Sequence, residues 1–166
     1  RPGDARVNRF DSRSTLVTGA ASGIGRASAM RLASEGAHVF CCDVDEKGLA
    51  EAVAAITAAG GTDVAHRLDV SDPAACRAAV AACASRFGKL DVLCNIAGVL
   101  TWNHFPDISE ATWNRVLAIN LSGVFFLSQA AIPHLLETRG VIVNMASTAA
   151  LRGQAYTAPY AASKAA

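Results

Sequence analysis

Short apolar runs alternate with longer stretches of helical spacing along most of this chain. The apolar runs, which predict buried strands, cover residues 15–18, 37–42, 64–68, 90–94 and 141–145. Apolar residues recur at helical spacing over residues 24–35, 46–59, 71–87 and 109–137, and again from Tyr160. Continuous apolar strands separated by helices are typical of a parallel sheet covered on both faces. The pattern therefore predicts one α/β domain over residues 14–166, preceded by a loose leader at residues 1–13.

Turn and capping residues set the expected helix ends. Ser71-Asp72-Pro73 offers a capping side chain followed by proline in the first helical turn, and Gly88 ends the same helix. Ser109 caps the long stretch 109–137. We expect that stretch to be broken near Asn120.

Composition excludes several classes of function. Hydrophobic residues make up 52% of the 166 residues and charged residues 17%, which indicates a compact core. The net charge of +1 provides no basic stripe for nucleic acid. No apolar run has the length that spans a bilayer, and the first ten residues are polar and charged. We therefore expect a cytoplasmic protein with neither a nucleic-acid partner nor a membrane partner.

The cysteines and histidines predict no metal site and no disulfide framework. Five cysteines are an odd number, none form a Cys-x-x-Cys pair, and the four histidines are scattered. Small buried thiols are the expected role of these cysteines.

Five markers stand at or just beyond the carboxyl ends of the five predicted strands. They are Gly19, Asp43, Asp69, Asn95 and Ser147. In open parallel α/β sheets the ligand binds along this edge. Five core strands would not all need a glycine or a polar residue there, so the markers predict a ligand site.

The first marker belongs to a glycine turn, Thr18-Gly19-Ala20-Ala21-Ser22-Gly23-Ile24-Gly25. Glycine permits positive φ and close approach of a phosphate, and the helix that follows presents free N–H groups to a pyrophosphate. The spacing is G-x-x-x-G-x-G rather than G-x-G-x-x-G. An ordinary strand-to-helix turn is the alternative.

Asp43 lies 18 residues after Gly25, as expected of an acid that accepts a hydrogen bond from a ribose 2′-hydroxyl. A 2′-phosphate would be repelled there, and neither Ser22 nor Val44 supplies a cation. We therefore expect NAD rather than NADP. A solvated aspartate in a turn is the alternative.

Two further markers fit the remaining parts of a dinucleotide. Asp69-Val70 is placed to contact the adenine, with a plain turn aspartate as an equal alternative. Asn95-Ile96-Ala97-Gly98 puts small residues where a ribose or nicotinamide approaches. Tight backbone packing explains the same residues and is compatible with cofactor binding.

Tyr160 and Lys164 are four residues apart on a predicted helix and so share a face. An ammonium beside the phenol lowers its pKa, as acid–base work near neutrality requires. Ser147 is placed to orient a substrate oxygen, and a main-chain carbonyl freed at Asn120 to hold a water leading to Lys164. Taken singly, each residue also has an ordinary structural explanation.

Taken together, these residues resemble the short-chain dehydrogenase/reductase (SDR) family. The matching segments follow the family's order and spacing from about Phe10 onward, and they are Thr18-Gly19 with Gly23-Ile24-Gly25, Asp43, Asp69-Val70, Asn95 to Gly98, Asn120, Ser147, and Tyr160 to Lys164. The resemblance implies a Rossmann-like doubly wound fold and NAD(P)(H) chemistry on an alcohol or ketone. It also implies a homodimer or homotetramer and a catalytic tetrad of Asn120, Ser147, Tyr160 and Lys164.

The markers and the resemblance together assign the cofactor contacts. These are Gly19, Ser22, Gly23, Ile24, Gly25, Asp43, Asp69, Val70, Asn95, Ala97, Gly98, Tyr160 and Lys164, with no metal ligand. The loops 101–105 and 148–159 are expected to flank the substrate, whose identity the sequence does not determine. Their large apolar residues suggest either a substrate wall or packing under a loop.

The chain departs from the family after Lys164, where only Ala165 and Ala166 follow. Family members continue with more helix and two further strands, so we expect a sheet that is incomplete on its C-terminal side. A non-catalytic dinucleotide-binding module is therefore the second hypothesis. A nucleoside-dependent methyltransferase is a third, which would not require Ser147, Tyr160 and Lys164 together.

Overall fold

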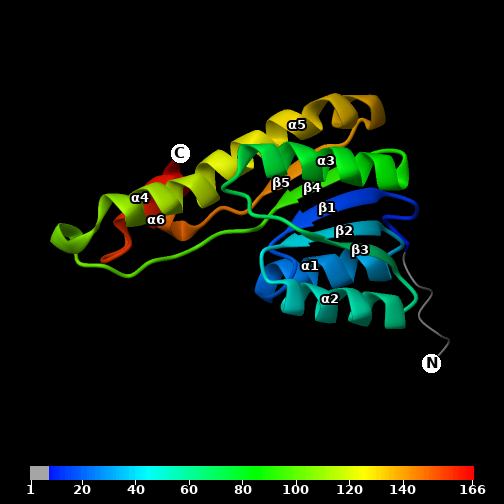
Figure 1. Cartoon of the computed structure of the whole chain (residues 1–166), viewed down its shortest axis with the longest axis horizontal. Coiled ribbons are helices and arrows are strands. Elements are labelled where there is room, and N and C mark those ends of the chain that lie inside the picture. The colour runs from blue at the N-terminus through cyan, green and yellow to red at the C-terminus, as the bar shows by residue number, and fades with distance from the viewer. Residues whose placement is uncertain (1–7) are drawn as a thin grey trace.

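A five-stranded parallel sheet forms the centre of the protein, as a computed structural model shows for residues 8–166. The strand order is β3-β2-β1-β4-β5 (Figure 1). Its strands are β1 (Ser14–Thr18), β2 (His38–Asp43), β3 (Thr62–Arg67), β4 (Val92–Asn95) and β5 (Val141–Asn144). The chain adds β2 and β3 on one side of β1, and then returns to add β4 and β5 on the other side. At this reversal of strand order, the carboxyl ends of β1 and β4 open a crevice. The predicted Rossmann-like parallel sheet is confirmed.

Helices cover both faces of the sheet (Figure 1). The elements α1 (Gly23–Ser34) and α2 (Glu46–Ala58) lie on one face, and α3 (Pro73–Phe87) and α5 (Gly123–Thr138) on the other. Beyond the carboxyl ends of the strands, α4 (Glu110–Leu117) contacts α6 (Ala158–Ala165). Along β2, Val39 and Cys41 pack toward α1 and α2, while Phe40 and Cys42 pack toward α3. Both faces are buried, which explains the continuous apolar runs.

The helix boundaries follow the predicted signals at α3. The Asp72 carboxylate accepts hydrogen bonds from the N–H groups of Ala74 and Ala75, Pro73 occupies the first turn, and Gly88 ends the helix with φ +76°. This αL ending is one that glycine adopts without a steric penalty.

The expected break near Asn120 is wrong in form. A π-helical turn, Ala118–Ser122, joins α4 to α5, so the helix runs without interruption from Glu110 to Thr138. A π turn inserts an extra residue and displaces the hydrogen-bond ladder without ending the helix, and such turns often lie at functional sites.

This long helix also corrects the expectation that no segment could span a bilayer. By length and composition alone it qualifies, with a mean hydropathy of 1.6 in its most apolar window, 28% of which is buried. Core helices pass the same test, and this one packs Leu127, Ala131 and Leu135 into the core.

The predicted loose leader, residues 1–13, is only partly covered, since residues 1–7 lie outside the described structure. Over residues 8–13 the prediction of a loose segment is wrong. Arg9 forms a bidentate ion pair with the buried carboxylate of Glu35. Arg13 bonds the buried carboxylate of Asp91, and the Phe10 amide donates to the Glu35 carbonyl. Residues 8–13 are therefore held against the amino ends of the strands by paired charges.

Candidate functional site

A cavity of about 740 Å³ opens at the carboxyl ends of the strands. Small-molecule sites commonly have volumes of this size. Ten of the residues predicted to contact the cofactor line the cavity, namely Gly19, Ser22, Gly23, Ile24, Gly25, Asp43, Asp69, Val70, Ala97 and Gly98. Three of the five markers, Gly19, Asp43 and Asp69, therefore reach one pocket, whereas Asn95 and Ser147 do not line it.

The glycine turn needs glycine for backbone conformation at two positions and for space at a third. Gly19 and Gly23 adopt φ of +71° and +53°, a region that side chains disfavour. A Cβ on Gly25 would lie 2.0 Å from the Gly19 carbonyl oxygen. Ser22 caps α1 without a side-chain hydrogen bond. The first-turn N–H groups of α1 thus remain available to an anion at the pocket.

Thr18, which belongs to the predicted glycine turn but not to the predicted cofactor contacts, fixes the next wall of the pocket. Its hydroxyl oxygen accepts from the amides of Ile96 at 3.0 Å and Ala97 at 3.1 Å. The same hydroxyl donates to the Cys94 carbonyl. A Cβ on Gly19 would lie 3.0 Å from the Ala97 backbone. Segment 96–98 is therefore packed tightly on the glycine turn, and it also lines the pocket.

Asp43 joins three segments at the pocket. Its carboxylate accepts from the Ala21 amide at 3.0 Å and from the Asp45 amide at 3.1 Å. Asp45, rather than Asp43, caps α2. Asp43 thus has a local role in the turn and also presents a charge to the cavity.

Asp69 likewise combines a turn role with a place in the pocket. It accepts hydrogen bonds from the hydroxyl and the amide of Ser71, at 2.7 Å and 2.9 Å. These bonds, with the nearby cations Arg67 and Arg115, hold its pKa below the usual range. Its carboxylate therefore stays ionised at the pocket.

Asn95 does not line the cavity. Its buried amide donates to Asn144 at 2.9 Å and to Ser128 at 3.3 Å, which ties β4 to β5 and α5. The structure thus gives Asn95 a packing role, and the predicted cofactor contact stays a prediction.

Asn120 is buried in the π turn and clamps the loop after β4. Its Oδ1 accepts from the Val99 amide at 2.8 Å, and its Nδ2 donates to the Val99 carbonyl at 2.9 Å. Nδ2 also donates to Ser163 on α6 at 3.0 Å. The side chain therefore connects three segments around the site.

Lys164 connects α6 to the end of β5. Its ammonium donates to the Met145 carbonyl at 2.7 Å and lies 5.9 Å from the centre of the Tyr160 ring. Burial lowers the pKa of Lys164. Met145 lines the cavity and Tyr160 and Lys164 do not, so Lys164 is connected to the cavity through the Met145 carbonyl.

Ser147 caps the 3-10 turn Thr148–Ala150, which follows β5 and contacts α6. Its hydroxyl accepts a hydrogen bond from the Ala149 amide at 3.2 Å. The tertiary structure thus places Ser147, Tyr160 and Lys164 on two elements in contact.

The expected substrate loops lie against each other. The Asn103 amide donates to the Tyr156 carbonyl at 2.9 Å, and the His104 and Tyr156 rings meet edge to face at 4.9 Å. Trp102, Phe105 and Leu151 are exposed. Packing under a loop therefore does not explain these three residues, which remain available to a substrate.

Two cations in the pocket were not predicted. Arg67 and Arg115 both line it, from β3 and α4. In the sequence each looks like an ordinary exposed arginine, because nothing local reveals that two distant elements meet at one cavity. Within residues 8–166, no three His, Cys, Asp or Glu side chains group as metal ligands, and all five cysteines are free and buried.

Comparison with known proteins extends these observations. The model of the short chain dehydrogenase family matches residues 13–166. D-threitol dehydrogenase of Mycolicibacterium smegmatis is 45% identical over 94% of this chain and 60% of its own length. Meso-2,3-butanediol dehydrogenase of Serratia marcescens is 37% identical over 94% of this chain and 61% of its own. The chain thus spans about three fifths of the length of these curated relatives.

Solved structures show the same likeness. A short chain dehydrogenase/reductase from Burkholderia phymatum, in complex with NAD, superposes with a TM-score of 0.91 at 37% identity, over 94% of this chain and 56% of that one. An NAD⁺-bound xylitol dehydrogenase superposes with a TM-score of 0.90 at 33% identity, over 95% of this chain and 61% of that one.

Proposed function

Because the chain belongs to the short chain dehydrogenase family, we propose that it transfers a hydride between NAD(H) and a secondary alcohol or its ketone. The observation that carries this proposal is the single cavity at the strand ends. It joins the glycine turn and the two aspartates to Met145, whose carbonyl accepts a hydrogen bond from Lys164. A cofactor in this cavity would reach the side chains proposed for acid–base chemistry.

The described residues fit a dinucleotide. Gly25 has no side chain to obstruct the turn, and the first-turn N–H groups of α1 have no capping side chain. Together they form a cradle for the pyrophosphate. Asp43 presents a carboxylate to the ribose hydroxyls, which favours NAD. Asp69 and Val70 are placed to hold the adenine.

The acid–base step uses α6 and the turn after β5. When bound, NAD would supply the acceptor for a hydride from the alcohol carbon of the substrate, and that carbon would become a carbonyl. The hydroxyl proton passes to the phenolate oxygen of Tyr160, and Ser147 orients the substrate oxygen. Lys164, held on the Met145 carbonyl, stabilises the phenolate by its charge and binds the ribose. The main-chain carbonyl of Asn120 holds the water that relays the proton.

The names of several relatives suggest which substrates to test first. Their names include a threitol, a butanediol and a chlorinated cyclohexadiene diol dehydrogenase. We therefore propose small secondary alcohols and vicinal diols as substrates, flanked by the loops 101–105 and 148–159.

The test is reduction of NAD by a panel of such alcohols, followed by absorbance of the reduced nicotinamide. Tyr160→Phe keeps the ring and removes the hydroxyl, so turnover should fall by a factor of roughly 10² to 10⁴ while the Kd for NAD stays within about twofold. Unchanged turnover in this variant would refute the mechanism. NAD binding without turnover in the parent chain would favour the non-catalytic module.

We also propose that copies of the chain associate through α5. Phe125, Ile132 and Leu136 on this helix are 57%, 48% and 75% exposed, an unusual amount of apolar surface for one helix. Leu136→Glu should shift sedimentation toward the monomer. A parent chain that sediments as a monomer contradicts the proposal.

A further inference from the structure

Arg67 lies beside Asp43 at the pocket end of the sheet. The register of the sheet pairs Asp43 on β2 with Arg67 on β3. Paired residues on neighbouring strands direct their side chains to the same face of a sheet. Both residues line the dinucleotide pocket. Ser22 and Val44 supply no cation, but Arg67 on β3 brings a positive charge to the same pocket.

The guanidinium of Arg67 has only a weak partner. Its Nε lies 3.9 Å from the Glu46 carboxylate, and the two side chains are 62% and 72% exposed. Exposed pairs of this kind contribute little to stability, so a phosphate could replace Glu46 at small cost. Among the ion pairs of residues 8–166, Arg67 takes part in no other.

Asp43 is less repulsive toward a phosphate than a free carboxylate would be. Its two oxygens accept N–H groups from Ala21 and Asp45, whose positive ends face the negative charge. A 2′-phosphate at the Asp43 ribose would therefore meet a partly compensated acid and a guanidinium whose ion pair with Glu46 is weak. Arginine is well suited to this contact, because its planar donors bind phosphate oxygens in pairs.

We propose that Arg67 sets the cofactor selectivity of this pocket, and that through it the chain binds NADP as a second dinucleotide besides NAD. The inference rests on the proposed function, since it needs a dinucleotide whose adenosine ribose lies at Asp43. Glu46 competes with the phosphate for the same guanidinium and so limits NADP affinity.

The experiment is calorimetric titration of the chain with NAD, NADP, 5′-AMP and adenosine 2′,5′-bisphosphate. The last two probes lack the nicotinamide, so their binding is independent of catalysis. Arg67→Gln should weaken NADP and the bisphosphate about tenfold while NAD and 5′-AMP stay within about twofold. Added salt should weaken NADP binding more steeply in the parent than in this variant.

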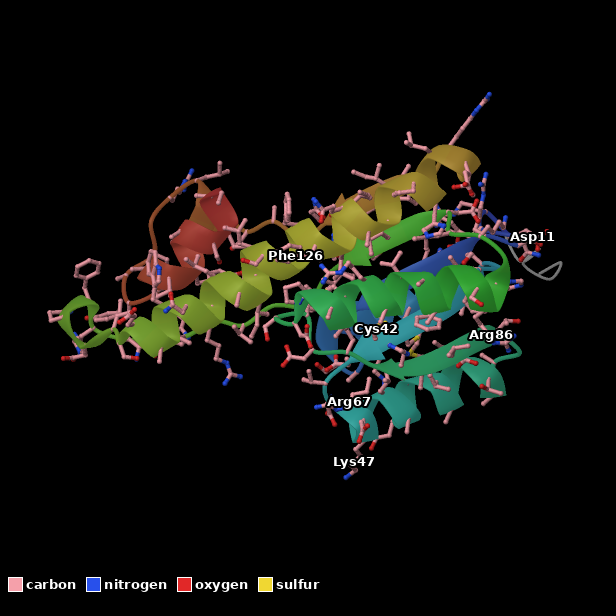
Figure 2. All side chains as sticks on the ribbon, turned by 45° about the horizontal axis from the view of Figure 1, so that its top comes forward. Asp11, Cys42, Lys47, Arg67, Arg86 and Phe126 are labelled. Atoms are coloured by element: carbon pink, nitrogen blue, oxygen red, sulfur yellow. The ribbon has the colours of Figure 1, made fainter. Side chains whose placement is uncertain are left out.

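Two further variants sharpen the result. Glu46→Gln should tighten NADP binding about two- to threefold, and this gain should vanish in the double variant with Arg67→Gln. Arg86→Gln is the matched control, because Arg86 lies in the last turn of α3, toward the other end of the strands from Arg67 (Figure 2). It should leave all four affinities unchanged.

The outcomes separate the two proposals. If NAD and 5′-AMP bind but Arg67→Gln leaves NADP unaffected, or weakens NAD and NADP equally, the selectivity role of Arg67 is refuted and the proposed function stands. If the parent chain binds neither NAD nor 5′-AMP, the proposed function itself fails, and this inference fails with it.

Discussion

Replacing Gly25 by alanine tests the glycine cradle most directly. The new Cβ would lie 2.0 Å from the Gly19 carbonyl oxygen and 2.5 Å from the Gly19 carbonyl carbon, whereas real Cβ atoms keep 3.0 Å or more. Relief therefore requires a backbone shift of about 1 Å. Gly19 cannot move freely, because the backbone of Ala97 packs on its other side.

The cost of this clash follows from the rigidity of both partners. Overpacking in a dense site typically costs about 1–3 kcal/mol, and contacts between backbone atoms lie at the upper end of that range. We expect Gly25→Ala to lower the free energy of unfolding by about 3 kcal/mol. The displaced turn should also weaken NAD binding more than about tenfold, since each 1.4 kcal/mol of lost contact is a factor of ten.

Two glycines with open space around them, Gly23 in the same turn and Gly60 outside the pocket, give matched controls. Gly23→Ala and Gly60→Ala each meet nothing within 4 Å, but both positions have positive φ, +53° and +80°. Backbone strain alone should cost each variant about 1 kcal/mol. Only Gly23 borders the pocket, so Gly60→Ala should leave NAD affinity unchanged. Urea unfolding and NAD titration check all three variants. A Gly25→Ala protein as stable as Gly60→Ala would refute the packing argument.

Three further predictions follow from buried polar groups. Arg9 hydrogen bonds lower the pKa of Glu35 from 4.5 to about 2, so its stabilising effect is complete above pH 4.5 and lost as pH falls toward 2. Urea unfolding should show the difference between the parent and Glu35→Gln disappearing across that range; a pH-independent difference would contradict it. Asn120→Ala leaves the amide and the carbonyl of Val99 without their hydrogen-bond partner, so the free energy of unfolding should fall by roughly 2–5 kcal/mol. A loss below about 1 kcal/mol would count against the proposed role of Asn120 in holding Val99. Burial raises the pKa of the cysteine thiols, to about 12 for Cys83, so a thiol reagent should label the five cysteines only on unfolding, and rapid labelling of the native protein would disprove this.

The order and type of the strands and helices could be predicted from sequence because they depend on local properties. Apolar runs buried on both faces, the Asp72–Pro73 start and the Gly88 end each act within a few residues of chain. The π turn at Asn120 could not be predicted, because its extra residue is stabilised by contacts with Val99 and Ser163 in distant segments. Residues 8–13 carry no apolar pattern, and it is ion pairs with Glu35 and Asp91 that order them.

The sequence by itself determined where ligand-facing residues belong, since parallel strands bring their carboxyl ends to one edge and a residue at each end must lie there. Gly19, Asp43, Asp69 and Ala97 reach one cavity for that reason. Only the tertiary structure decided what each of them touches. It turned Asn95 away toward Asn144, used Thr18 to hold the wall at Ile96, and brought Arg67 next to Asp43. These outcomes depend on strand register and side-chain packing between segments far apart in the chain, which no local pattern encodes.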